Sequence, residues 1–239
     1  MEFFYDFHIH SCLSACADND MTPKNLANMA KLAGLDIIAL TDHNSCLNCP
    51  ATQKAAEEAG LGFVPGMELC TQEEVHLICL FPDLERALSF SEHVGGLLPE
   101  IENKPDIFGD QIIMGENDNF LGNHKKLLNS ACQIDLEDAV KKVEGLKGFC
   151  YPAHIDRPSY SLLSNLGDID PSMGFSAFEV TAKADLNALY ASHPHLKKLR
   201  LMRGSDAHTL ADISDAFHTI NLKNNSLKDV LDYLNKKTF

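Results

Sequence analysis

Segments with the pattern of buried strands alternate with segments of helical pattern along almost the entire chain. Such alternation predicts parallel strands with helices packed outside them. About seven of these units favour a barrel over an open sheet, and barrels of this type carry their active sites at the carboxyl ends of the strands. The predicted strands cover residues 3–10, 36–40, 62–68, 75–81, 148–154, 175–180, 200–208 and 217–222.

The alternation breaks down between Gly95 and Ser130, where glycines, prolines and scattered charges replace any regular pattern. We expect an irregular, partly helical insertion over the site at about residues 95–130. A chain of 239 residues is long enough to bury one sizeable core. We therefore predict a single barrel domain that spans residues 1–239.

Composition places the chain among ordinary globular proteins. Hydrophobic residues make up 45% and charged residues 23% of the chain. No apolar run is long enough to span a membrane, and the amino terminus lacks the pattern of a signal peptide. We therefore predict a cytoplasmic protein whose eight cysteines are reduced thiols or metal ligands.

The formal net charge of −14 bears on possible partners. Binding to extended nucleic acid relies on basic surfaces that contact many phosphates, so the charge argues against such a partner. An acidic chain suits a site that binds cations, although solvated surface residues account for most of the excess negative charge.

Two histidines occupy alternate positions at the end of the first predicted strand. Because residues two apart on a strand point to the same side, His8 and His10 project together, with Asp6 beneath them. Two imidazoles held in this way form half of a metal site. A carboxylate behind them fixes their tautomers, and Asp6 is the candidate.

Residue types that bind metals also end the other predicted strands. Any one of them is compatible with an ordinary polar strand end, but the regular placement of the whole set is not. Imidazole and carboxylate ligands suit zinc, manganese or iron, and a set of this size suggests more than one ion. The further members are His43, Glu68, His76, His154, Asp206 and His208.

Six short motifs contain these residues. They are Asp6-Phe7-His8-Ile9-His10-Ser11, Thr41-Asp42-His43-Asn44, Pro65-Gly66-Met67-Glu68, Val75-His76-Leu77, Pro152-Ala153-His154 and Gly204-Ser205-Asp206-Ala207-His208. Taken in order, they resemble the motifs of the PHP (polymerase and histidinol phosphatase) superfamily. The resemblance implies an α/β fold, a distorted (β/α)7 barrel, with two or three divalent metal ions at its mouth. It also implies hydrolysis of phosphoesters.

The same resemblance distributes the ligands over three metal positions. The first takes His8, His10, Glu68 and Asp206. The second shares Glu68 and adds His76 and His154. The third takes His43, His208 and a residue of the first loop, where the family has a histidine or an aspartate. We favour Asp18 over Asp20 for that place because it lies nearer the strand end.

The implied chemistry is that of a metallohydrolase. Cations that lower the pKa of a bound water provide a hydroxide at neutral pH and neutralise charge on the phosphoryl oxygens. Arg157 is expected to hold the substrate phosphate, Arg203 is a weaker candidate for that contact, and Asp42 is expected to support the ligands. The predicted catalytic residues are Glu68, Asp206, His208 and Arg157.

Four cysteines lie in the first two loops that follow strands, namely Cys12, Cys16, Cys46 and Cys49. The two loops are neighbours in a barrel, so the four thiolates are candidates for an additional zinc or iron–sulfur site. Against this, the spacing of the first pair is unusual for such a site, and ordinary thiols are the alternative.

Taken together, these features predict a metal-dependent phosphatase that hydrolyses a small phosphorylated substrate, with no membrane partner. The first alternative is a nuclease or phosphodiesterase acting on nucleotides, against which the acidic charge argues. An amide hydrolase is a second alternative, and a non-catalytic metal or redox sensor is a third. Loss of metal ligands would favour the sensor, and none is evidently lost.

Overall fold

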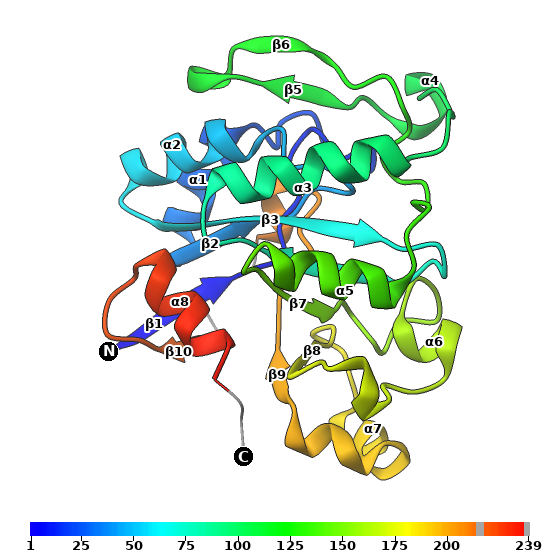
Figure 1. Ribbon diagram of the computed structural model, residues 1–239. Coiled ribbons are helices and arrows are strands. Elements are labelled where there is room, and N and C mark those ends of the chain that lie inside the picture. Colours follow the sequence, from blue (N-terminus) through cyan, green and yellow to red (C-terminus); the bar gives the residue numbers. More distant parts are fainter. Residues whose placement is uncertain (214–217, 237–239) are drawn as a thin grey trace.

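A curled sheet of six strands forms the centre of the molecule. The computed structural model describes residues 1–213 and 218–236 (Figure 1). In spatial order the strands are β10 (Thr219–Asn221), β1 (Glu2–Asp6), β2 (Ile37–Leu40), β3 (Gly62–Cys70), β4 (His76–Leu80) and β7 (Phe149–Pro152). The predicted strand at 217–222 corresponds to β10, and its first residue, Phe217, lies outside the described residues.

The direction of β4 departs from the prediction of parallel strands. β1, β2 and β3 are parallel, but β4 pairs antiparallel with both β3 and β7. The connection from β3 to β4 covers only residues 71–75, and a parallel pair needs a crossover of roughly a dozen residues or more. Because β4 runs in reverse, its first residue, His76, lies at the edge where its neighbours end.

A separate parallel pair, β8 (Ala177–Glu179) and β9 (Arg200–Met202), stands across the open side of the curled sheet. Hydrogen bonds beyond the strand ends tie it to the main sheet. The amide of Ile155 donates to the carbonyl of Glu179 at 2.9 Å, and the amide of Asp206 donates to the carbonyl of His8 at 2.9 Å. The fold is therefore α/β, as predicted, with a curled half-barrel sheet, and the count of seven strands in a barrel stays a prediction.

Helices cover the outside of the sheet. The principal ones are α1 (Pro23–Leu32), α2 (Cys49–Ala59), α3 (Leu84–Leu97), α5 (Leu136–Gly145) and α8 (Leu227–Leu234). The predicted start at Thr22-Pro23 is confirmed, because the Thr22 side chain accepts a hydrogen bond from the amide of Asn25. Among the described residues, no helix combines the length and apolar character that crossing a membrane requires.

The alternation of side chains along the strands divides the core in two. In β2, Ile38 and Leu40 join the apolar cluster that includes helix residues such as Leu26. Ile37 and Ala39, which precede these two residues in β2, point to the other face and join a second cluster that includes Phe7 and Tyr151. All of these side chains are buried. A strand that is apolar on both faces is typical of a sheet covered on both sides.

The region expected to be an irregular insertion contains a short hairpin. β5 (Ile112–Met114) and β6 (Phe120–Asn123) flank the 3-10 turn η1 (Glu116–Asp118), and the one-turn helix α4 (Pro105–Phe108) precedes them. The hairpin lies beyond α1 and α2, at the top of Figure 1. Thr22 donates to the Asp118 carboxylate at 2.6 Å, which attaches the hairpin to the start of α1.

The chain after β7 contains only short elements before β10. These are α6 (Leu162–Leu166), η2 (Pro171–Met173), α7 (Leu186–Ser192), η3 (Pro194–Lys198) and η4 (Leu210–Asp212). They connect β7, β8 and β9, whose carboxyl ends carry three of the predicted metal ligands. Of these elements, α6 and α7 lie at the lower right of Figure 1.

Candidate metal centre

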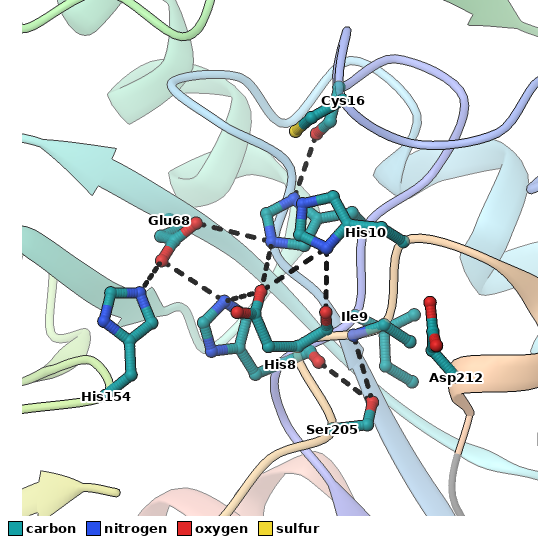
Figure 2. A network of polar contacts seen from close by, with 12 residues as sticks. His8, Ile9, His10, Cys16, Glu68, His154, Ser205 and Asp212 are labelled. Carbon is teal, nitrogen blue, oxygen red and sulfur yellow. Dashed lines mark hydrogen bonds and ion pairs between the residues drawn. The ribbon is translucent and has the colours of Figure 1, made fainter. Parts of the chain in front are cut away.

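Eight of the nine predicted metal ligands converge at one edge of the sheet. Each comes from the end of a strand or the residues just after it, except that Glu68 lies within β3 and His76 begins β4. Figure 2 shows His8, His10 and His154 arranged around the Glu68 carboxylate. The eight residues are His8, His10, His43, Glu68, His76, His154, Asp206 and His208.

Glu68 is the centre of this cluster. Its Oε1 atom lies 3.3 Å from His8 Nε2, 2.9 Å from His76 Nδ1 and 3.0 Å from His154 Nε2. Its Oε2 atom lies 3.3 Å from His10 Nε2 and 3.0 Å from His43 Nδ1. Five imidazole nitrogens therefore surround one carboxylate that is only 1% exposed. A carboxylate that faces two sets of nitrogens, one with each oxygen, has the arrangement of a bridging ligand.

Three groups of side chains place their ligand atoms within 4.8 Å of one another. Asp206 belongs to the first, because its Oδ1 atom lies 3.2 Å from His8 Nε2 and 3.3 Å from His10 Nε2. Within the part of the chain that the structure describes, the groups are His8, His10, Glu68 and Asp206; His43, Glu68 and His76; and His10, His43 and His208.

The donor set fits divalent cations. His8 Nε2, His10 Nε2 and His43 Nδ1 are buried atoms of the cluster without a hydrogen-bond partner. Leaving a buried polar atom unsatisfied costs about 1–3 kcal/mol, so several together in one cluster call for a ligand that they would share. Neutral imidazole and carboxylate are the ligands that zinc, manganese and iron accept.

The charges within the cluster shift its pKa values strongly. Burial alone would lower the pKa of His43, but the carboxylate of Glu68 and the thiol of Cys16 outweigh it and raise that pKa to about 10. Burial likewise opposes the charge on His8, and the carboxylates of Glu179, Asp206 and Glu68 together raise its pKa well above the ordinary value. Without metal, positive charges on imidazoles therefore balance the buried carboxylates.

Glu179 supports the ligands in the place that the sequence suggested for Asp6. Its buried Oε1 atom lies 2.8 Å from His8 Nδ1 and accepts a hydrogen bond from the His154 amide at 3.2 Å. The Asp6 carboxylate instead accepts from the backbone amides of His8 and Ser205, each at 3.1 Å. The only sequence signal for Glu179 was its position at the end of a predicted strand.

Asp42 acts on the ligands through Ser14. The Ser14 hydroxyl donates to Asp42 Oδ1 at 2.7 Å and lies 3.0 Å from His10 Nδ1. The same hydroxyl accepts a hydrogen bond from the His43 amide at 3.1 Å. Asp42 thus orients two imidazoles without facing the cluster itself, as expected. The sequence offered no signal for Ser14 beyond its place in the first loop.

Unusual backbone conformations occur at two of the ligands. His154 has φ 30° and Asp206 has φ 53°, in the left-handed region that non-glycine residues seldom adopt. Gly204, two residues before Asp206, packs closely against the cluster. A Cβ atom at Gly204 would lie 2.4 Å from the Cβ atom of His8, so only glycine fits there.

The structure does not bring Asp18 into the cluster. Asp18 is exposed, and it belongs to none of the groups of metal-binding side chains in the described ranges. Asp20 is exposed as well. The first loop is a succession of tight turns, in which the Asp18 amide donates to the carbonyl of His208 at 2.8 Å. The same loop places Cys16 near the imidazole rings, as Figure 2 shows.

Arg157 lies beside the cluster and forms an ion pair with the Asp206 carboxylate. Its side chain is 44% exposed, so it faces both the ligands and the solvent. A cavity of about 300 Å³ adjoins it and is lined by Arg203 and His218 among others. Arg203 also donates to the carbonyl of Thr181 at 3.0 Å. Both predicted phosphate-binding arginines therefore border the same cavity.

The structure does not bring the four cysteines of the first two loops together. Cys46 and Cys49 are buried, and their sulfur atoms lie 3.1 Å and 3.5 Å from the carbonyl oxygen of Gly66. Cys12 is buried and lies near Ile112, whereas Cys16 is exposed beside the imidazoles. In the described residues these sulfurs form no group of three or more ligands, so the additional cysteine site is not supported.

Fold and site together define the class, an α/β protein with a candidate metal centre at one edge of its sheet. The chain belongs to the PHP domain family, whose sequence profile matches residues 6–158. This assignment confirms the resemblance found in the motifs.

Two relatives share about a third of their aligned residues with this chain. An uncharacterized protein of Methanocaldococcus jannaschii is 32% identical over 98 residues, which cover 37% of this chain and 57% of the relative. A 5′–3′ exoribonuclease of Haemophilus influenzae is 32% identical over 79 residues, which cover 32% of this chain and 28% of the relative. The match thus spans little more than half of one relative and less than a third of the other.

Solved structures share the fold at low sequence identity. The lesion-specific endonuclease Q of Pyrococcus furiosus has a TM-score of 0.68 and 20% identity, over 98% of this chain and 56% of that protein. Endonuclease Q has also been solved with a 27-mer duplex that carries an abasic lesion at the active site. A Bifidobacterium adolescentis protein, provisionally described as a metal-dependent phosphoesterase, has a TM-score of 0.59 and 17% identity. The match covers 96% of this chain and 95% of that protein.

These comparisons correct the expected partner. The sequence analysis predicted a small phosphorylated substrate and argued against extended nucleic acid from the net charge. That prediction is wrong, because similar proteins include an exoribonuclease and an endonuclease solved with duplex DNA. Net charge sums the whole surface, whereas a nucleic acid meets only the groups that border the site.

Proposed function

We propose that this chain is a metal-dependent phosphodiesterase that cleaves nucleic acid. The observation that carries the proposal is the Glu68 carboxylate surrounded by five imidazole nitrogens at 2.9–3.3 Å. The relatedness to an exoribonuclease and the fold shared with endonuclease Q support nucleic acid as the substrate. A non-catalytic sensor finds no support, since all eight strand-end ligands are present and meet.

The residues that would hold a first cation form one of the groups described above, and those of a second are the two imidazoles within 3.0 Å of Glu68 Oε1. His8, His10 and Asp206 would hold one cation, His76 and His154 a second, and Glu68 would contact both. When bound, such cations supply Lewis acidity and a nucleophilic water at neutral pH. The chain's own carboxylates offset the cationic charge, and Glu179 keeps His8 in the tautomer whose Nε2 atom faces the cluster.

Two arginines would orient the phosphodiester. Arg157 is ion-paired with Asp206, so a phosphate oxygen that it binds lies next to the cluster. Arg203 borders the same cavity of about 300 Å³, which is of the size that a small ligand or a single nucleotide occupies. We infer that the scissile phosphate meets Arg157 and that a neighbouring nucleotide enters this cavity.

A set of two arginines fits a short stretch of nucleic acid better than a long duplex tract. Arg157 and Arg203 are the two arginines that line the cavity beside the cluster. A chain end or a locally exposed strand can present one or two phosphates to such a site. We therefore propose single-stranded ends as the preferred substrate.

The test uses protein freed of metal and then reconstituted with zinc, manganese or iron. Labelled RNA and DNA oligonucleotides, single-stranded and duplex, with a 5′ phosphate or a 5′ hydroxyl, are incubated with it. We expect metal-dependent cleavage of single strands, and no cleavage by the Glu68→Gln variant. Hydrolysis of a generic aryl phosphate without cleavage of any oligonucleotide would contradict the nuclease proposal.

A further inference from the structure

Tyr160 places an exposed aromatic ring directly against the candidate metal centre. Its ring centroid lies 4.9 Å from that of His76, with an angle of 31° between the two planes. His76 Nδ1 in turn lies 2.9 Å from Glu68 Oε1. Tyr160 is 45% exposed, and among the described residues it is the one exposed aromatic side chain whose ring packs on a candidate metal ligand. Part of the ring is therefore covered by an imidazole of the cluster, and the rest is open to solvent.

The backbone of Tyr160 is held in an unfavourable conformation. Its φ is 52°, in the left-handed region that bulky side chains disfavour. The Tyr160 carbonyl accepts a hydrogen bond from the His76 amide at 3.2 Å, and the hydroxyl of the next residue, Ser161, donates to the Arg157 carbonyl at 2.7 Å. Strained residues that their surroundings hold in this way are concentrated at ligand-binding sites. The fold thus keeps the ring at the cluster against its backbone preference.

Local helix packing does not account for the ring. Tyr160 directly precedes Ser161, the N-cap of α6, and an apolar residue at that place often packs against the fourth residue of the helix. The fourth residue of α6 is Asn165, whose side chain donates to the carbonyls of Glu73 and Glu74 at 2.8 Å and 2.9 Å. These bonds attach α6 to the turn between β3 and β4 and so anchor the loop that carries Tyr160.

The same loop carries Arg157. The Arg157 amide donates to the His154 carbonyl at 2.9 Å, and its guanidinium is ion-paired with Asp206. Arg157 and Arg203 line the cavity of about 300 Å³, whereas Tyr160 is not among the described residues that line it. A base that contacts Tyr160 therefore belongs to a different nucleotide from the one that would enter the cavity.

We propose that the open part of the Tyr160 ring stacks on a nucleobase of the substrate and so selects unpaired bases next to the scissile phosphate. The proposal rests on the proposed function and adds a base contact to it. Every base has a π face, so stacking on an aromatic side chain accepts any sequence. Inside a duplex, neighbouring base pairs already cover both faces of a base. Tyr160 would therefore favour single strands over duplexes without reading their sequence.

The first experiment measures the Kd of a cleavage-resistant fluorescent single strand by anisotropy, with metal-reconstituted protein. We expect Tyr160→Leu to weaken binding roughly fivefold to a hundredfold, because the stacking face is lost. Tyr160→Phe keeps the ring and should stay within about twofold of the wild type. Phe120→Leu, at an aromatic residue that is 65% exposed on β6, is the matched control and should bind as the wild type does.

The second experiment is a thermodynamic cycle between Tyr160 and the base. Single abasic residues are placed at successive positions from the 5′ end of the strand. At the position that contacts Tyr160, removal of the base should weaken binding to the wild type but have no further effect in Tyr160→Leu. A ring with a purely structural role would leave the effect of each abasic residue the same in both proteins. Both strands meet the same protein, so the comparison holds even if Tyr160→Leu retains less metal.

The outcomes separate this proposal from the proposed function. If the wild type binds and cleaves single strands but Tyr160→Leu matches it, or no abasic position is coupled to Tyr160, stacking is wrong and the phosphodiesterase proposal stands. Equal losses in Tyr160→Phe and Tyr160→Leu would assign the contact to the hydroxyl and also overturn stacking. If the wild type neither binds nor cleaves any oligonucleotide, both proposals fail.

Discussion

Glu68 is the residue on which most of the cluster depends. Its two oxygens face different imidazoles, so Glu68→Gln removes the negative charge that two neighbouring cations would share. We expect metal content to fall at both positions and not at one alone, which elemental analysis of the purified variant measures. Glu58→Gln, an exposed position on α2, is the control. An unchanged metal count in Glu68→Gln would show that Glu68 is not a ligand.

Arg157 and His154 lie three residues apart but should respond differently to substitution. Arg157→Ala removes a charge-assisted contact to the phosphate, typically about 1.5–3 kcal/mol, so kcat/KM should fall roughly tenfold to a hundredfold. Metal content should stay unchanged, because a guanidinium does not bind cations. His154→Ala should lose both metal and activity. Arg86→Ala, on α3, serves as the control, and wild-type kcat/KM in Arg157→Ala would exclude the contact.

Metal binding should release protons. The pKa of His8 is raised well above its usual value and that of His43 is raised to about 10, so both imidazoles are protonated near neutral pH without metal. A cation binds only the neutral form, so it displaces these protons, and its affinity should rise with pH. Calorimetry in buffers of different ionisation enthalpy measures the release. Glu68→Gln should release fewer protons, because Glu68 raises both pKa values. Heats independent of the buffer would contradict this prediction.

At the residue scale, the sequence predicted which strand-end side chains lie close together, but not the residues that support them. His8, His10 and Asp206 could be identified because each is of a metal-binding residue type and lies at the end of a predicted strand. Glu179 and Ser14 could not, because their roles depend on which segments meet in space. Asp18 was chosen for its distance along the chain, but the turns of the first loop leave its side chain exposed.

At the scale of elements, Asn44 connects the inserted region to the sheet. Its side chain donates to the carbonyls of Leu128 at 2.6 Å and Ser130 at 2.8 Å, and accepts from the Cys70 amide at 2.8 Å. Asn44 also has φ 50°, a conformation that asparagine tolerates better than alanine. Asn44→Ala should therefore lower the free energy of unfolding by about 2 kcal/mol or more.

Urea denaturation monitored by circular dichroism measures this loss. Asn25→Ala, which removes a single exposed side-chain hydrogen bond on α1, is the matched control and should change stability little. Equal stability of the Asn44→Ala variant and the wild type would show that the inserted region is not anchored through this residue.

The order of elements was predictable, but the direction of β4 and the hairpin of the insertion were not. Strand and helix patterns report local burial, and β3 and β4 show the same apolar pattern in either direction. The short turn between them was the one available sign of an antiparallel pair. The β5–β6 hairpin is partly exposed and includes a glycine, so it lacks the apolar alternation that identifies strands.

At the scale of the whole molecule, the number of phosphates that the chain contacts sets how strongly its affinity depends on salt. If Arg157 and Arg203 make the phosphate contacts, the logarithm of affinity should fall with the logarithm of salt concentration at a slope of roughly −1.5 to −2. Fluorescence anisotropy with a cleavage-resistant oligonucleotide measures this slope. Arg203→Ala should make it shallower by about one unit, and a slope several times steeper would point to a wider interface.

The strained backbone at His154 and Asp206 and the unsatisfied imidazoles have a consequence for the protein in its cell. Each strained residue costs about 1–3 kcal/mol, and bound cations compensate because they stabilise only the folded chain. A newly made chain that finds no metal therefore opens more often at this edge of the sheet. Opened chains are the ones that proteases remove, so the amount of this protein should follow the supply of metal as well as the rate of its synthesis.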